Sequence, residues 1–133
     1  MSDVRVLELG NFIAGPFAGQ LLGDYGAEVI KIESPDGGDP MRRWGVTVDS
    51  RSLWWPTIAR NKQSVVADLR DADDLAMVRQ LCAECDVVLE NFRPGTLAEF
   101  GLDYSAIAAT NPGVIITHVS GFGQTGPRSP EAG

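Results

Sequence analysis

Short apolar runs of the kind that form buried strands alternate along this chain with segments of helical spacing. The five runs are residues 4–9, 27–33, 64–69, 86–90 and 114–119. No hairpin turn signal joins neighbouring runs, so each connection is expected to cross over and return to the same end of the sheet. The alternation therefore predicts an α/β domain with a largely parallel sheet and flanking helices.

The first connection has the signals of a helix. Pro16 suits the first turn of a helix, where a missing N–H costs nothing, and Gly26 can end the helix. Phe17, Leu21 and Leu22 recur at helical spacing and supply its apolar face.

The later connections are less regular. Residues 34–40 are rich in Pro, Gly and Asp and predict a long loop. Residues 53–59 predict a short helix with its tryptophans packed inward. Asp71 or Asp73 can cap a longer helix that carries apolar residues from position 75 to 82. Two further helical segments are expected, at residues 97–100 and 104–110.

Length and charge exclude several classes of protein. A chain of 133 residues with 44% hydrophobic residues suits one globular domain. Its net charge of −7 argues against a general nucleic-acid-binding protein. No apolar run approaches the length of a membrane span, and the N-terminus lacks the pattern of a signal peptide. We therefore expect a cytoplasmic protein with no membrane or nucleic-acid partner.

One segment reverses the overall charge. Residues 42–62 hold five of the eleven bases and a single acid, Asp49, so the segment is locally +4. Such a reversal suits a small polyanionic ligand. A solvated loop with scattered arginines would give the same pattern, and the two interpretations stay open at this point.

The cysteines and the single histidine are expected to be structural. Cys82 and Cys85 form a CxxC at the end of a predicted helix, whereas redox-active pairs lie at a helix start. A zinc site needs four ligands, and His118 is the only histidine, so no metal site is expected. His118 itself ends an apolar run, which is typical of a structural histidine.

Ligands of parallel α/β sheets bind at the carboxyl ends of the strands, so the loops there are the places to search. Residues 121–126 match GxGxxG, but Pro127 follows and no helix start lies inside the motif, which argues against a dinucleotide fingerprint. Asn91, Phe92 and Arg93 combine an amide, an aromatic ring and a guanidinium that could bind a nucleotide phosphate. A helix-initiating turn with Pro94 at its first position explains the same residues.

Eight short motifs follow one another along the whole chain. They are Ala14–Pro16, Gly26–Glu33, Gly38–Pro40, Arg60–Ser64, Glu90–Gly95, Gly101–Tyr104, Asn111–Pro112 and Ser120–Pro127. In this order they resemble the opening of class III CoA-transferases, the formyl-CoA transferase and CaiB/BaiF type. The resemblance implies that residues 1–133 form a Rossmann-like, CoA-binding part at the N-terminus of a larger domain.

The resemblance also implies contacts to coenzyme A after the first, third and fourth strands. The implied CoA-binding residues are Ile13, Ala14, Ala67, Asp68, Leu69, Arg70, Asn91, Phe92 and Arg93. Ser34 and Glu99 stand where members of the family carry basic residues. Either CoA lies differently here or other arginines compensate, namely Arg42, Arg43 and Arg93.

In the family an aspartate carboxylate attacks an acyl-CoA thioester, and a second carboxylic acid finally takes over the CoA. That aspartate is expected beyond Gly133, so no catalytic residue is assigned within this chain, which we expect to be inactive alone. The full-length parent is expected to form an interlocked homodimer. A fragment of an α-methylacyl-CoA racemase, with its histidine just after Gly133, is a second hypothesis. A non-catalytic CoA-binding or assembly module is a third.

Overall fold

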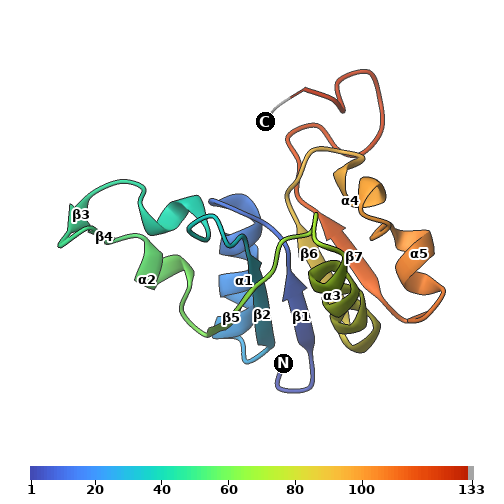
Figure 1. Cartoon of the computed structure of the whole chain (residues 1–133), viewed down its shortest axis with the longest axis horizontal. Helices are drawn as coiled ribbons and strands as arrows, with labels where there is room; N and C mark the ends of the chain where they lie inside the picture. The colour runs from blue at the N-terminus through green and yellow to red at the C-terminus, as the bar shows by residue number, and fades with distance from the viewer. Residues whose placement is uncertain (132–133) are drawn as a thin grey trace.

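A computed structural model describes residues 1–131 and contains a five-stranded, fully parallel sheet with helices on both faces (Figure 1). Its strands are β1 (Arg5–Glu8), β2 (Glu28–Glu33), β5 (Lys62–Val66), β6 (Val87–Glu90) and β7 (Ile115–His118). They are ordered β5-β2-β1-β6-β7. The predicted α/β class with a parallel sheet is therefore confirmed.

Helices cover the two faces of the sheet unequally. The helices are α1 (Ala14–Asp24), α2 (Trp55–Ile58), α3 (Ala72–Glu84), α4 (Thr96–Glu99) and α5 (Tyr104–Ala108). Helix α1 packs on one face against Val6, Val29 and Leu89. Helices α3, α4 and α5 pack on the other face, in a larger core that includes Leu7 and Val88. Successive side chains of a strand therefore pack into two different cores, which is why the strands are apolar on both sides.

Helix α1 faces the sheet mainly through small residues, and of the three apolar residues predicted for this face only Leu22 packs against the core. Gly19 and Gly23 are buried, whereas Phe17 is 50% exposed and Leu21 is 41% exposed. A Cβ at Gly19 would lie 2.0 Å from Glu8 Oε2. The close approach to a buried carboxylate requires glycine, and Phe17 and Leu21 lie on the exposed side of the helix.

A two-stranded hairpin interrupts the alternation of strands and helices, where no hairpin was predicted. Strand β3 (Thr47–Val48) pairs antiparallel with β4 (Arg51–Ser52). The turn residues Asp49 and Ser50 have φ values of 49° and 63°. Such positive values are typical of hairpin turns, and Asp and Ser tolerate them less readily than Asn-Gly. Figure 1 shows this hairpin and α2 projecting from the side of the sheet.

The tryptophans near α2 are not packed inward as predicted. Trp54 is 52% exposed, and Trp44 contacts both Trp54 and the ring of Phe12. Because α2 packs against α1 and not under the sheet, Trp44 and Trp54 line a surface cavity and are not part of either core.

Some strands and helices begin or end a few residues away from their predicted boundaries. Strand β5 begins at Lys62, two residues before the predicted run, and ends at Val66. Asp71 is the residue that caps α3, since its carboxylate accepts hydrogen bonds from the N–H groups of Asp73 and Asp74. Helix α4 begins after Gly95, so Pro94 precedes the helix and does not occupy its first position. Among residues 1–131 there is no helix of the length and apolarity that spanning a membrane requires.

Candidate functional site

The strand order reverses between β1 and β6, and the side chain of Asn91 joins the two strand ends at this point. Asn91 Oδ1 accepts a hydrogen bond from the Asn11 N–H at 2.8 Å, and its amide nitrogen donates to the Asn11 carbonyl at 2.9 Å. Open parallel sheets bind ligands beside such a reversal, because the connecting segments leave in opposite directions there.

Two glycines leave room for the Asn91 amide. A Cβ at Gly10 would lie 2.6 Å from Asn91 Oδ1, and one at Gly15 would lie 3.0 Å from it. The first strand can therefore turn into α1 close to Asn91 only with glycine at both positions. Since Asn91 is already bonded to the backbone of Asn11, its role in this structure is to join the loops after β1 and β6.

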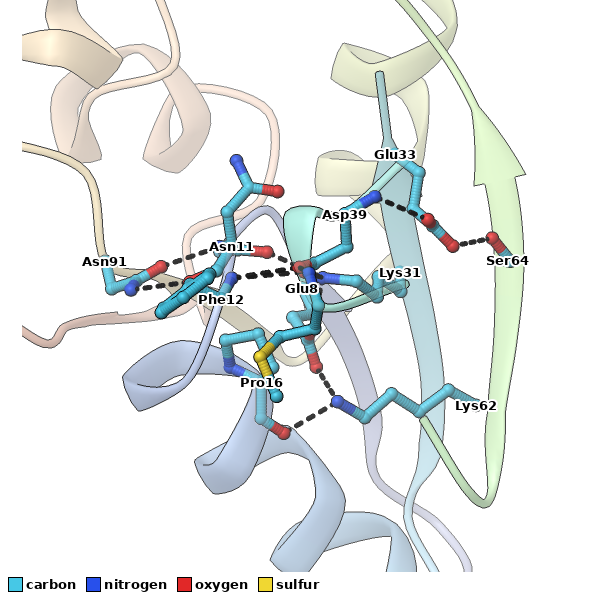
Figure 2. A network of polar contacts seen from close by, with 12 residues as sticks. Glu8, Asn11, Phe12, Pro16, Lys31, Glu33, Asp39, Lys62, Ser64 and Asn91 are labelled. Carbon is cyan, nitrogen blue, oxygen red and sulfur yellow. Dashed lines mark hydrogen bonds and ion pairs between the residues drawn. The ribbon is translucent and has the colours of Figure 1, made fainter. Parts of the chain in front are cut away.

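A buried ionic network lies directly beneath these loops (Figure 2). Lys31 Nζ is 2.9 Å from Glu8 Oε1, 2.8 Å from Asp39 Oδ2 and 2.7 Å from the Gly10 carbonyl. The side chains of Lys31, Glu8 and Asp39 are no more than 1% exposed. Buried charges are tolerated when they are paired and hydrogen-bonded, and this lysine joins β1, β2 and the loop after β2.

Lys62 brings a second buried cation to Glu8. Its Nζ lies 2.7 Å from Glu8 Oε2, without the alignment of a hydrogen bond, and donates to the Pro16 carbonyl at 2.6 Å. Burial lowers the pKa of Lys62, and Glu8 opposes that shift by favouring the charged form. The contact joins β5 to the first turn of α1 through the carboxylate on β1.

Asp39 carries the network to the loop after β1. Its carboxylate accepts the Phe12 N–H at 3.1 Å and 3.2 Å and the Met41 N–H at 2.8 Å. Phe12 has a φ of 69°, an unusual value for a residue with a large side chain. The buried carboxylate stabilises this backbone, which places Ile13 and Ala14 at the start of α1.

A further carboxylate, Glu33 at the end of β2, holds the loop after β2. It accepts hydrogen bonds from Arg42 Nε and Nη2, both at 2.7 Å, from the Asp39 N–H at 2.9 Å and from the Ser64 hydroxyl. Burial alone would raise the pKa of Glu33, but these donors outweigh it and lower the pKa to about 2. We refer to Glu33 with these three partners as the Glu33 clamp.

Glu90, at the end of β6, makes a comparable set of contacts. One oxygen accepts the Phe92 N–H at 2.6 Å, and the other pairs with His118 Nδ1 on β7. Glu90 and His118 are register partners on adjacent parallel strands. We refer to Glu90 with His118 and the Phe92 N–H as the Glu90 clamp. The expectation that His118 is a bonded, structural histidine fits this contact.

Two surface cavities meet at Phe92. One, of about 360 Å³, is lined by Ala14 and by residues 91–94 and 119–121. The other, of about 370 Å³, is lined by residues 67–70 together with Asn11, Ser34 and Phe92. Eight of the nine residues that the resemblance assigned to CoA line one or both cavities: Ala14, Ala67, Asp68, Leu69, Arg70, Asn91, Phe92 and Arg93.

Ile13 is the exception. Its side chain is 45% exposed and lines a separate, mainly apolar cavity of about 360 Å³ with Phe17, Trp44 and Trp54. Ile13 and Ala14 are adjacent in the chain but line different cavities. Sequence reasoning did not anticipate this cavity, because Trp54 was expected to pack inward and no role was assigned to Trp44.

The charged residues of the two cavities differ in their partners. Arg70 is paired with Asp68 at 2.9 Å and approaches Asp36 at 3.4 Å, and the first of these lowers the pKa of Asp68. Arg93 lines the first cavity and makes no ion pair with residues 1–131. Glu99, which departs from the family pattern, is exposed and lines neither cavity.

Three of the five basic side chains in residues 42–62 pair with acidic side chains of the same chain. Arg42 pairs with Glu33, Arg60 with Asp24 at 2.5 Å, and Lys62 with Glu8. These three bases therefore serve the fold, which answers the open question about this segment mainly in favour of structure. Arg42, one of the arginines expected to compensate for Glu99, is engaged in the Glu33 clamp.

The cysteines are buried thiols, as predicted. Burial raises the pKa of Cys82 to about 12 and that of Cys85 to about 11, so both are protonated and unreactive at neutral pH. Within residues 1–131, no three His, Cys, Asp or Glu side chains are grouped in a way that could hold a metal ion.

Comparison with known proteins decides the family. The chain matches CoA-transferase family III over residues 1–133. The chain belongs to this family. It is 59% identical over 134 residues to succinyl-CoA–D-citramalate CoA-transferase of Chloroflexus aurantiacus, and 42% identical over 134 residues to human succinyl-CoA:glutarate CoA-transferase. The crystal structure of a CaiB/BaiF family protein from Brucella suis matches 99% of the chain with a TM-score of 0.91 and 43% identity.

The family member described here spans about a third of the length of these relatives. The matched region is 100% of this chain but 33% and 31% of the two transferases, and 36% of the Brucella chain. The resemblance inferred from the eight motifs is confirmed. Sequence reasoning missed the network of Glu8, Lys31 and Asp39. The signal for Glu8 and Lys31 was a charged residue inside an apolar strand run, whereas Asp39 lies in a loop and gave no such signal.

Proposed function

We propose that this chain is the CoA-binding N-terminal part of an enzyme that transfers CoA from an acyl-CoA thioester to a free carboxylic acid. Family III enzymes act on acyl-CoA substrates. The relatives named above are both CoA-transferases, which favours this function over the racemase. The acyl donor and acceptor would belong to the succinyl-CoA and dicarboxylic acid class that their names state.

One observation carries the CoA-binding part of the proposal. Eight of the nine residues implied by the resemblance come from three separate loops, yet they line two cavities that share Phe92 at the strand-order reversal. A nucleotide lying across Phe92 would reach both cavities, with its base against the aromatic ring. The guanidinium of Arg93 is available to a phosphate, whereas Arg70 would have to leave Asp68.

The remaining steps belong to the longer enzyme. We expect its nucleophilic aspartate beyond Gly133, its assembly as an interlocked homodimer, and no transfer of CoA by residues 1–133 alone. The role of this chain is then to bind and orient the acyl-CoA so that its thioester faces the aspartate. A cytoplasmic location stays a prediction from the sequence.

Titration of the ¹⁵N-labelled chain with CoA tests the binding site by NMR. We expect weak binding, with the largest amide shift changes in residues 10–14, 67–70 and 91–93. Arg93→Gln should weaken binding about threefold to tenfold, because it removes a charge-assisted phosphate contact. Arg51→Gln removes the same charge from the hairpin and should leave binding unchanged. Shift changes confined to other residues would contradict the site.

A second measurement tests the reaction. Exchange of labelled acyl groups between acyl-CoA and free dicarboxylic acid is expected for the full-length gene product and absent for residues 1–133. Transfer by the 133-residue chain alone would overturn the expectation that the nucleophile lies beyond it. Racemisation of a 2-methylacyl-CoA by the full-length product, without exchange, would favour the racemase.

A further inference from the structure

The Glu90 clamp links a titratable side chain to the backbone of the loop that lines both cavities. Glu90 is only 3% exposed, and each of its oxygens has one partner. The Phe92 N–H is the partner on one side, and the His118 imidazole is the partner on the other. Glu90 on β6 and His118 on β7 are register partners, so one carboxylate contacts both the imidazole and the loop after β6.

His118 stands between the buried carboxylate and a small cavity. Its side chain is 31% exposed, and with Glu90 it lines a cavity of about 200 Å³. Three other ionisable groups line this cavity: Arg93 from the loop after β6, and Asp103 and Tyr104 at the start of α5. Asp103 caps α5 by accepting the Ala106 N–H, so its carboxylate is engaged by its own helix.

We propose that Glu90 and His118 are positioning residues that hold the Asn91–Arg93 loop in its CoA-binding conformation, and hold it most firmly when the imidazole is protonated. The inference rests on the proposed function, since it concerns the loop that we assign to CoA. Neither side chain needs to touch the substrate. Glu90 fixes the Phe92 N–H, and His118 fixes the Glu90 carboxylate.

The pH dependence follows from the two charge states of the imidazole. An imidazolium forms a charge-assisted hydrogen bond with the carboxylate, whereas a neutral imidazole with a proton on Nδ1 donates a weaker bond. The ionisable groups that face the imidazole are Glu90, Arg93, Asp103 and Tyr104. When the imidazole loses its proton at higher pH, its hydrogen bond to Glu90 weakens but persists, and Glu90 holds the Phe92 N–H less firmly.

The first test needs no ligand. In a pH titration of the chain followed by NMR, the Phe92 amide proton should shift with the same midpoint as the His118 imidazole. His118→Gln should abolish this shift. The Asp39 N–H, which donates to Glu33, is an internal control that should stay constant between pH 5 and 8, because the partner of Glu33 is an arginine. A Phe92 amide that ignores the titration of His118 would overturn the linkage.

The second test measures CoA binding by the same chain and its variants. His118→Gln should weaken CoA binding about threefold to tenfold at pH 5.5 and less than twofold at pH 8. The ratio of variant to wild-type Kd is the quantity compared, since the CoA phosphate titrates in the same range and cancels in the ratio. Thr117→Val, on the preceding residue of β7, is the matched control and should give a ratio near one at both pH values.

The two tests separate the inference from the proposed function. If Phe92 follows His118 but wild-type chain gives no shift changes with CoA, the proposed site fails while the clamp stands. If CoA binds at the loop but the His118→Gln ratio is the same at both pH values, the positioning role is wrong. An equal loss of binding in Thr117→Val would indicate a general effect on β7 and also count against the inference.

Discussion

Two strand ends in this protein are held by buried carboxylates, and their basic partners differ. Glu33 ends β2 and binds the Arg42 guanidinium, whereas Glu90 ends β6 and binds the His118 imidazole. In each case one backbone N–H of the following loop donates to the carboxylate, from Asp39 and from Phe92 respectively. The same arrangement therefore holds two loops at the carboxyl end of one parallel sheet.

The choice of partner decides how each loop responds to its surroundings. Arginine stays charged at any physiological pH and offers two parallel donors, so the Glu33 clamp is permanent. The loop it holds supplies Asp39, on which the backbone of Phe12 depends. The Glu90 clamp has an imidazole in place of the guanidinium, and we infer that it holds its loop most firmly when this imidazole is protonated. An arginine thus supports the loop after β1 through Glu33 and Asp39, and a histidine supports the loop that contains Phe92 through Glu90.

Glu33→Gln is the substitution with the largest expected effect. It removes a buried charge that accepts four hydrogen bonds from three residues, and we expect it to lower the free energy of unfolding by about 3 kcal/mol at pH 7. Glu90→Gln, which affects two contacts, should cost about 1 to 2 kcal/mol. Urea unfolding followed by tryptophan fluorescence measures both. Glu84→Gln, on an exposed side chain of α3, is the control and should stay within about 0.5 kcal/mol. Equal losses at Glu33 and Glu90 would remove the distinction between the clamps.

Acid should weaken the Glu33 clamp over a defined range of pH. The folded-state pKa of Glu33 is about 2, below its ordinary value of 4.5, so this carboxylate stabilises the fold above pH 4.5. That stability is lost as pH falls from about 4.5 to about 2. In unfolding measurements at pH 6, 4 and 3, the difference between wild type and Glu33→Gln should therefore shrink steadily. A constant difference across this range would show that Glu33 is not charged in the folded state at pH 3.

The smallest expected effect distinguishes the two basic partners. His118→Gln should lower the free energy of unfolding by about 0.5 to 1 kcal/mol at pH 5.5 and by less at pH 8. Arg42→Gln should cost the same at both values, because its partner and its own charge do not change there. Thermal and urea unfolding of the two variants at both pH values provides the comparison. A pH-dependent cost for Arg42→Gln would contradict it.

The sequence predicted the fold well where one local pattern was sufficient. Each of the five apolar runs became a strand of the parallel sheet, and Asp71 capped α3 as one of the two predicted alternatives. The sequence prediction failed where the structure depended on a residue far away in the chain or on an unusual turn sequence. Phe17 and Leu21 of α1 were wrongly assigned to the buried face, because the sheet below the helix carries a buried carboxylate, Glu8, which only glycine can approach. The hairpin at Asp49 and Ser50 was missed because its turn residues are not the usual hairpin pair.

The candidate site shows the same division. Residues 91–93 could be proposed from their chemistry and from their position at a strand end, and the family motifs supplied the rest. The ionic network beneath them could not be proposed. Lys31 binds Glu8, 23 residues earlier, and Asp39, eight residues later, and neither spacing is a local pattern. A charged residue within a strand run gives no indication of which partner will neutralise it.

By itself, the sequence determined the parallel α/β architecture and the family, because periodicity and motifs are local properties of the chain, and it predicted the loops that we propose for CoA. The tertiary structure alone decided that Asn91 joins two loops, that most of the basic segment is neutralised internally, and that Glu33 and Glu90 have different partners. These outcomes depend on which charges meet in a space without water. There an unpaired charge costs several kcal/mol, so the pairing is set by the packing of the whole sheet.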